Sequence, residues 1–139
     1  MPIVVRAVEE PEYELWLAEQ RREAEAAHET VGKTWTMDEL MESGEQVYNQ
    51  NCMACHQANG QGIPPAFPSL VGSPLIKGPI ADHTDMVVNG KAGTAMQAFG
   101  VQLNPAQIAA VITFERNAWG NNSGEMIQPS EINNLLSGQ

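Results

Sequence analysis

The sequence is poor in several residue types, and each shortage excludes a class of protein. The chain has only two cysteines and three histidines. It has no second cysteine pair and no closely spaced histidine pair, so the four ligands of a structural zinc site are missing. With 7 basic against 17 acidic residues, the formal net charge of -10 argues against nucleic acid and anionic membranes as partners. No apolar run reaches the length of a transmembrane helix, and aromatic residues make up only 6%. The composition indicates one domain with an extension, lean in apolar side chains and acidic enough to suit a basic partner.

The few cysteines and histidines are concentrated in one motif, Cys52-Met53-Ala54-Cys55-His56. This is the attachment pattern of c-type haem, in which two thiols form thioethers with the porphyrin vinyl groups and the histidine ligates the iron. A thioredoxin-like redox motif would follow a strand, whereas a helical pattern precedes Cys52. A structural disulfide would leave His56 unexplained. The motif therefore favours one covalent haem with His56 as proximal iron ligand.

The N-terminal residues lack the export signal that this chemistry requires. Haem of the c type is attached on the outer side of the energy-transducing membrane, yet Met1 to Glu10 contain no apolar signal-peptide segment. We therefore expect the chain to be a fragment of a longer protein whose export signal lies upstream of Met1.

The first 35 residues are expected to form an extension. Met1–Val8 is a short β-rich run that predicts one strand. Pro11 opens a helical pattern that continues into the charged run Glu19–Glu29, where we expect His28 to be exposed. Thr30–Trp35 contains a glycine and is interpreted as a linker. This places domain boundaries at 1–35 for the extension, 36–122 for the main domain and 123–139 for a tail.

Two helices are predicted from their capping signals. Thr36-Met37-Asp38-Glu39 is a capping box, and the helix that it begins should run into Cys52. Asn104-Pro105 supplies an N-cap followed by proline, which predicts a second helix ending at Gly120.

These two helices are predicted to contact each other. Glycine inside a helix destabilises it by about 1 kcal/mol relative to alanine, so Gly44 indicates a close approach by another helix. We expect Phe114 to pack near Gly44 and Tyr48 in the core.

The long segment between the two helices is expected to cover the haem. Gln57–Gly78 is rich in glycine and proline, and unstructured loops of this length are uncommon unless they are functional. A carbonyl near Pro64 or Pro65 is predicted to accept a hydrogen bond from the proximal histidine. Phe67 and Leu70 are predicted to cover the ring.

Shorter elements complete the expected chain. A helix should follow Asp82, cover Asp85–Asn89 and end at Gly90. Residues 121–124 are interpreted as a turn, and Ser130 is expected to cap a last helix through Leu136.

Met96 is the favoured second iron ligand. It lies in Gly93–Gly100, a loop of small residues that can approach the haem from the side opposite the proximal histidine. A thioether opposite histidine favours the ferrous state and raises the potential. Met86, within an apolar helical run, and His83 are the alternatives, although their patterns are more typical of a core and a surface residue.

Taken together, these motifs resemble class I cytochrome c over roughly Thr36 to Gly120. The resemblance implies an all-α fold with one covalent haem c, with Met96 and Phe99 of the later loop at the haem. The residues that carry it are CxxCH, Gly44 and Tyr48, Pro64-x-x-Phe67-Pro68-x-Leu70, Met96-x-x-Phe99 and the helix Ile108 to Phe114.

A further resemblance covers nearly the whole chain. It is to the cytochrome c domain fused to subunit II of some bacterial cytochrome c oxidases. The motifs that carry it are Met1-Pro2-Ile3-Val4-Val5, Glu12-Tyr13-Glu14-Leu15-Trp16-Leu17, Gly90-Lys91-Ala92-Gly93-Thr94-Ala95-Met96 and Arg116-Asn117-Ala118-Trp119-Gly120-Asn121.

This resemblance implies an electron-transfer domain at the periplasmic face of the bacterial cytoplasmic membrane. It would accept electrons from a soluble c-type cytochrome and pass them to the binuclear copper centre of its own subunit, with oxygen reduced in subunit I. Met1 matches a copper ligand of the family, but the other ligands are absent, so no copper is expected here and the domain alone should catalyse no reaction. A free periplasmic cytochrome shuttle and a haem enzyme or sensor with an open iron position are the alternatives.

Overall fold

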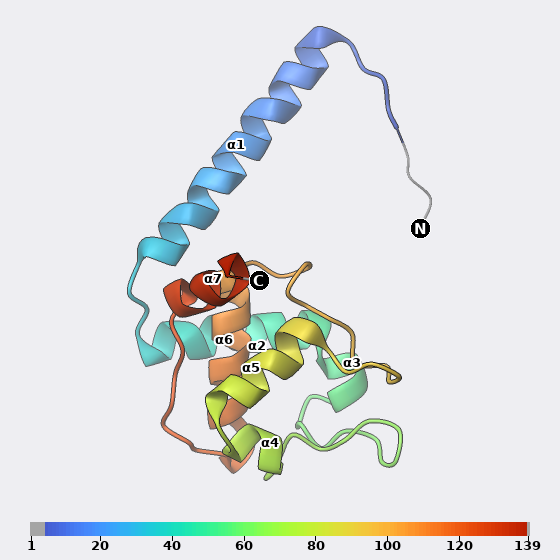
Figure 1. The fold of residues 1–139 in the computed structure, drawn as a ribbon, viewed down its shortest axis with the longest axis vertical. Coiled ribbons are helices and arrows are strands. Elements are labelled where there is room, and N and C mark those ends of the chain that lie inside the picture. The colour runs from blue at the N-terminus through green and yellow to red at the C-terminus, as the bar shows by residue number, and fades with distance from the viewer. Residues whose placement is uncertain (1–4, 139) are drawn as a thin grey trace.

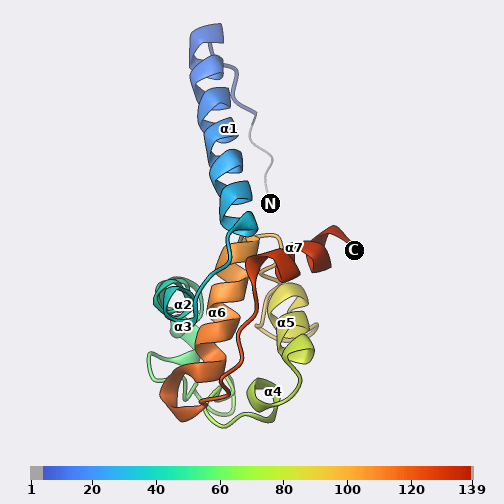
Figure 2. The ribbon, with the colours of Figure 1, turned by 90° about the vertical axis from the view of Figure 1, so that its left-hand side faces the viewer.

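A long helix and a group of packed helices make up the structure, a computed structural model. It describes residues 5–138, apart from the side chains of residues 23, 24, 27 and 28. Helix α1 (Glu10–Gly32) stands away from the group that α2 to α7 form (Figure 1, Figure 2). None of the helices in this range is both long and apolar enough to cross a bilayer.

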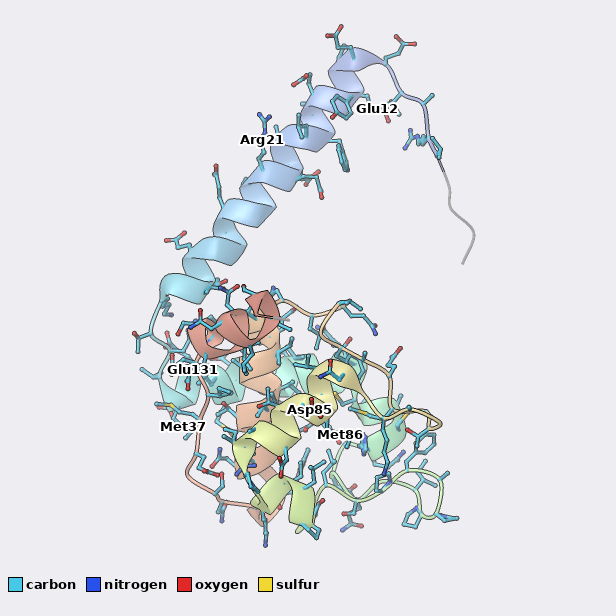
Figure 3. The ribbon with its side chains drawn as sticks, in the orientation of Figure 1. Glu12, Arg21, Met37, Asp85, Met86 and Glu131 are labelled. Carbon is cyan, nitrogen blue, oxygen red and sulfur yellow. The ribbon has the colours of Figure 1, made fainter. Side chains whose placement is uncertain are left out.

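The extension consists of α1 preceded by irregular chain. Helix α1 has Pro11 in its first turn, as predicted, and Glu12 and Arg21 lie along its length (Figure 3). The predicted strand is wrong for residues 5–8, and its residues 1–4 lie outside the described range. A strand needs a partner, and the described residues contain only one isolated bridge, between Ile63 and Phe67. The side chain of His28, predicted to be exposed, is also outside the described set.

The connection between α1 and α2 is shorter than predicted and is held by side chains. Helix α1 continues to Gly32, past the expected linker start at Thr30. The Trp35 indole N–H donates to the Thr30 carbonyl at 2.9 Å and satisfies one of the carbonyls that a helix end leaves unpaired. The Gln128 side chain pairs with the backbone N–H and carbonyl of Trp35, at 2.9 and 3.0 Å. The connection is thereby bonded to the C-terminal segment.

Helices α2 (Met37–Asn51) and α6 (Pro105–Asn117) begin after their predicted N-caps, Thr36 and Asn104, and the structure adds that Asn104 and Gln107 also form a capping box. They cross at Gly44, as expected: a Cβ atom there would lie 2.2 Å from the Ala110 carbonyl oxygen and 2.6 Å from the Phe114 Cβ. Leu40, Val47, Ile108 and Ile112 of the two helices are buried in the core around this contact. The α2–α6 pair is therefore a close packing of backbones.

An aromatic cluster extends this contact toward the residues after His56. The ring of Tyr48 lies 5.6 Å from that of Phe114 and 4.8 Å from that of Trp119, which confirms the predicted position of Phe114. The Tyr48 hydroxyl donates to the Gln57 carbonyl at 2.6 Å, and the Trp119 indole N–H donates to the Ala58 carbonyl at 3.1 Å. Both helix ends thus hold the backbone that follows the CxxCH motif.

The remaining elements are short. They are α3 (Met53–His56), α4 (Pro74–Lys77), α5 (Ile80–Asn89), the 3-10 turn η1 (Ala118–Gly120) and α7 (Pro129–Ser137). Helix α4 lies inside the predicted loop, and α5 begins before Asp82 because Pro79 serves as its N-cap. Helix α7 is capped by Gln128 and Glu131 in a capping box, so the assignment of the cap to Ser130 was wrong. Gly90 ends α5 with a φ of 68°, as its type predicted.

Acid should weaken the start of α2 through Glu39. Hydrogen bonds from Lys33 and from the Thr36 backbone and hydroxyl lower the pKa of Glu39 from 4.5 to about 2. Because the folded pKa is the lower one, this stabilisation is present above pH 4.5 and is lost as pH falls toward 2. We expect Glu39→Gln, which keeps the capping-box shape, to be slightly less stable than the wild type at pH 7 and equal to it near pH 2. Denaturant unfolding at several pH values checks this, and Glu42→Gln, a matched substitution on the same helix outside the capping box, is the control.

Candidate haem site

The CxxCH motif lies where α2 ends and α3 begins. Cys52 is the C-cap of α2, and α3 continues in helical conformation to His56. Residues three and four positions apart share one helix face, so Cys52, Cys55 and His56 all line a single cavity of about 510 Å³. The two thiols are free. This arrangement is consistent with attachment of one porphyrin edge to both sulfurs, with the imidazole next to it.

His56 is oriented by a backbone carbonyl. Its Nδ1 lies 3.0 Å from the Pro68 carbonyl oxygen, which can only accept a hydrogen bond. In the neutral ring Nδ1 therefore carries the hydrogen and Nε2 keeps its lone pair, as an iron ligand requires. The proposed acceptor near Pro64 or Pro65 was wrong by a few residues. Pro64 and Pro65 lie within the turn that the Ile63–Phe67 bridge closes, and the carbonyl that reaches His56 is that of Pro68, just after the bridge.

Most of the predicted haem-covering residues line the cavity. Phe67, Leu70 and Phe99 do so, with Leu70 and Phe99 buried, whereas Pro64 is not part of its lining. Apolar walls of this kind would exclude water from a haem.

Met96 also lines the cavity, as predicted. Its loop lies against the end of α5: the Lys91 N–H donates to the Met96 carbonyl at 3.0 Å. A Cβ atom on Gly90 would lie 2.7 Å from the Met96 carbonyl oxygen, so glycine permits this approach. Met86 on α5 (Figure 3) and His83 line the same cavity, so lining alone does not select the second ligand. Nε2 of His83, however, is already 2.8 Å from a carboxylate oxygen of Glu115.

Glu115 is a site residue that the sequence reasoning missed. It lies on α6, is only 5% exposed, and lines the cavity together with His83. Burial raises the pKa of the Cys52 thiol, and the Glu115 charge adds to that increase. The signal that could have found it is a carboxylate directly after the apolar run that ends at Phe114, four positions beyond the buried Val111 on the same helix face.

The residues of the cavity fit a covalent haem better than a bare metal ion. Among residues 5–138, no group of three or more His, Cys, Asp or Glu side chains is placed to hold a metal. Two free thiols, an imidazole with a free Nε2, a thioether and apolar walls are the set that c-type haem uses. The all-helical fold and this site define a cytochrome c domain.

Comparison with known proteins identifies the family. Residues 39–114 match the family model described as "Cytochrome C oxidase, cbb3-type, subunit III", and the chain belongs to this family. As a cytochrome c domain it binds one covalent haem c with iron.

Three relatives show how such domains occur. The chain is 30% identical over 106 residues to "Alcohol dehydrogenase (quinone), cytochrome c subunit" of Gluconobacter oxydans, covering 67% of this chain and 22% of that protein. It is 36% identical over 90 residues to "Cytochrome c-552" of Thermus thermophilus, covering 55% of this chain and 68% of the relative. It is 34% identical over 97 residues to "Cbb3-type cytochrome c oxidase subunit CcoP" of Azospirillum brasilense, covering 66% of this chain and 32% of that protein. The chain thus spans about a fifth of the length of the dehydrogenase subunit.

These relatives support the cytochrome c domain and not the finer resemblance to oxidase subunit II. They are named as cytochrome c subunits of dehydrogenases, a cytochrome c-552 and CcoP, and none of the three is an oxidase subunit II. The resemblance to class I cytochrome c is confirmed at the level of the cytochrome c domain.

Proposed function

We propose that this chain is an electron-transfer domain in which Cys52 and Cys55 anchor the haem and His56 and Met96 ligate its iron. The observation that carries the proposal is that one cavity brings together both thiols, the oriented imidazole and the Met96 side chain. When bound, the haem supplies one-electron chemistry at its iron. His56 and Met96 would ligate the iron in either oxidation state, which would limit rearrangement on electron transfer.

The finer proposal is a domain tethered to oxidase subunit II at the periplasmic side of the membrane. It would accept electrons from a soluble c-type cytochrome and pass them to the binuclear copper centre of the same subunit, beside subunit I. The support is the sequence resemblance across Glu12–Leu17 and the other quoted motifs. Helix α1 adds support because it extends away from the other helices, as a tether to a further domain requires (Figure 1).

A free electron shuttle is the second candidate. The chain covers 68% of the Thermus cytochrome c-552, a relative of domain size rather than a long subunit. The gene context distinguishes the two: an open reading frame that continues upstream through copper ligands supports the tethered domain, and its absence supports the shuttle.

Purified, matured protein tests the proposed domain function directly. We expect a pyridine haemochrome spectrum of the c type, an intact mass increased by one haem, and rapid one-electron exchange with a reduced soluble c-type cytochrome. The reduced protein should bind carbon monoxide only slowly at neutral pH, because both axial positions are filled. A colourless protein with the mass of its amino acids would refute the proposal, and rapid carbon monoxide binding would instead support an enzyme or sensor.

A further inference from the structure

A buried acid–base pair lies in the haem cavity and has no part in anchoring or ligating the haem. His83 on α5 is 1% exposed and Glu115 on α6 is 5% exposed. The His83 Nε2 and a Glu115 carboxylate oxygen are 2.8 Å apart, and both residues line the cavity. The other ring nitrogen, His83 Nδ1, is buried without a hydrogen-bond partner among the described residues. Such groups are rarely buried unless paired, so the pair places an ionisable unit in the wall of the haem site.

The charge of this pair reaches the groups at the haem attachment. Glu115 raises the pKa of the Cys52 thiol and contributes, after burial, to the raised pKa of the Tyr48 hydroxyl. Cys52 is also one of the two sulfurs placed to anchor the porphyrin, so Glu115 lies beside that edge of the ring. In a site of low polarity, a charge so close interacts strongly with any charge change at the iron. A net negative pair favours ferric iron, and a neutralised pair favours ferrous iron.

We propose that the His83–Glu115 pair is a proton-binding site coupled to the oxidation state of the haem. When a donor gives one electron to the iron, the pair takes up one proton from the solvent. When the electron leaves, the pair releases that proton. The added electron and proton cancel in charge, so the buried site keeps its net charge. The inference needs haem in the cavity, but neither the donor nor the acceptor of the proposed function.

Other ionisable groups lie around the pair, and attachment of the haem would remove several of them from consideration. Cys52 and Cys55 become thioethers, His56 is committed to the iron, and Tyr48 titrates only at high pH because its pKa is raised. The basic side chains nearby are Lys91 in the cavity lining, Lys77 on α4 and Arg116, which pairs with Glu125. Carboxylates outside the cavity on the neighbouring helices include Asp82 and Asp85 on α5 and Glu131 on α7. The remaining competitor is the pair of haem propionates.

Proton uptake by the holoprotein on reduction tests this directly. The protein is reduced in weakly buffered solution containing a pH indicator, and its midpoint potential is measured across roughly pH 5 to 8, where histidine changes charge. We expect proton uptake approaching one per haem, and a reduced-to-oxidised ratio at fixed applied potential that falls by up to about tenfold per pH unit. Absence of both effects in the wild type overturns the proposal without any variant.

Two uncharged variants assign the site. Glu115→Gln and His83→Gln should each abolish most of the proton uptake and flatten the pH dependence, and Glu115→Gln should raise the potential on the alkaline side. Asp85→Asn, on the exposed face of α5, is the matched control and should behave as the wild type. Helical circular dichroism and the haem spectrum show whether each variant is folded. If folded variants keep the full pH dependence, the proton belongs to the haem propionates and the proposal is wrong.

Discussion

The Met96→Ala holoprotein should lose the sulfur-to-iron charge-transfer band, bind carbon monoxide rapidly when reduced, and show a lower midpoint potential than the wild type. The reason is the thioether, which stabilises ferrous iron and blocks the sixth position. This is the largest spectroscopic effect that we expect from any single substitution. The loop itself should persist, because the Lys91 N–H bonds the backbone carbonyl of residue 96.

Met86→Ala is the matched control for this experiment. Met86 lines the same cavity on α5 and is also only partly buried. Truncating Met86 should lower the free energy of unfolding. The decrease should not exceed the roughly 2–5 kcal/mol expected for a fully buried methionine. The charge-transfer band should remain in place. If the band survives in Met96→Ala and disappears in Met86→Ala, the ligand assignment must be exchanged.

Gly44→Val should lower the free energy of unfolding by about 3 kcal/mol or more. Its first side-chain carbon would meet the Ala110 carbonyl at 2.2 Å and the Phe114 Cβ at 2.6 Å, so α2 and α6 would have to separate. Gly44→Ala should also destabilise, although alanine gains about 1 kcal/mol in intrinsic helix propensity. Denaturant unfolding followed by far-UV circular dichroism measures both.

Gly32→Ala provides the control for the helix-propensity gain. Gly32 is the last residue of α1, and a Cβ atom there would have nothing within 4 Å. That variant should keep or slightly increase the wild-type stability. Wild-type stability in both Gly44 variants would show that the two helices do not approach as closely as the structure has them.

Features that depend on neighbouring residues in sequence were predictable. The capping box at Thr36 predicted the start of α2, and the N-cap Asn104 followed by Pro105 predicted the start of α6, because these signals act between residues close in sequence. Gly44 was also informative. Glycine weakens a helix, so its presence inside one indicates that another helix approaches too closely for a larger side chain. The CxxCH spacing brought three site residues to one cavity because they share a helix face.

Tertiary contacts that no single residue type marks in the sequence were not predictable. The acceptor for His56 is Pro68 rather than Pro64 or Pro65, and that depends on how the loop returns across the Ile63–Phe67 bridge. The His83–Glu115 pair joins residues 32 positions apart, and His83 alone was interpreted as a surface residue. The strand expected near the N-terminus followed from composition, but no described segment offers it a partner.

The bonds from Tyr48 and Trp119 to the chain after His56 have a consequence for the iron. Tyr48 bonds the Gln57 carbonyl and Trp119 bonds the Ala58 carbonyl. The orientation of the His56 imidazole therefore depends on how α2 and the end of α6 pack against each other. A substitution that weakens the packing of α2 against α6 should therefore also weaken the bond between His56 and the iron. The absorption spectrum of the haem should therefore respond to substitutions at this helix contact, although the contact lies outside the haem site.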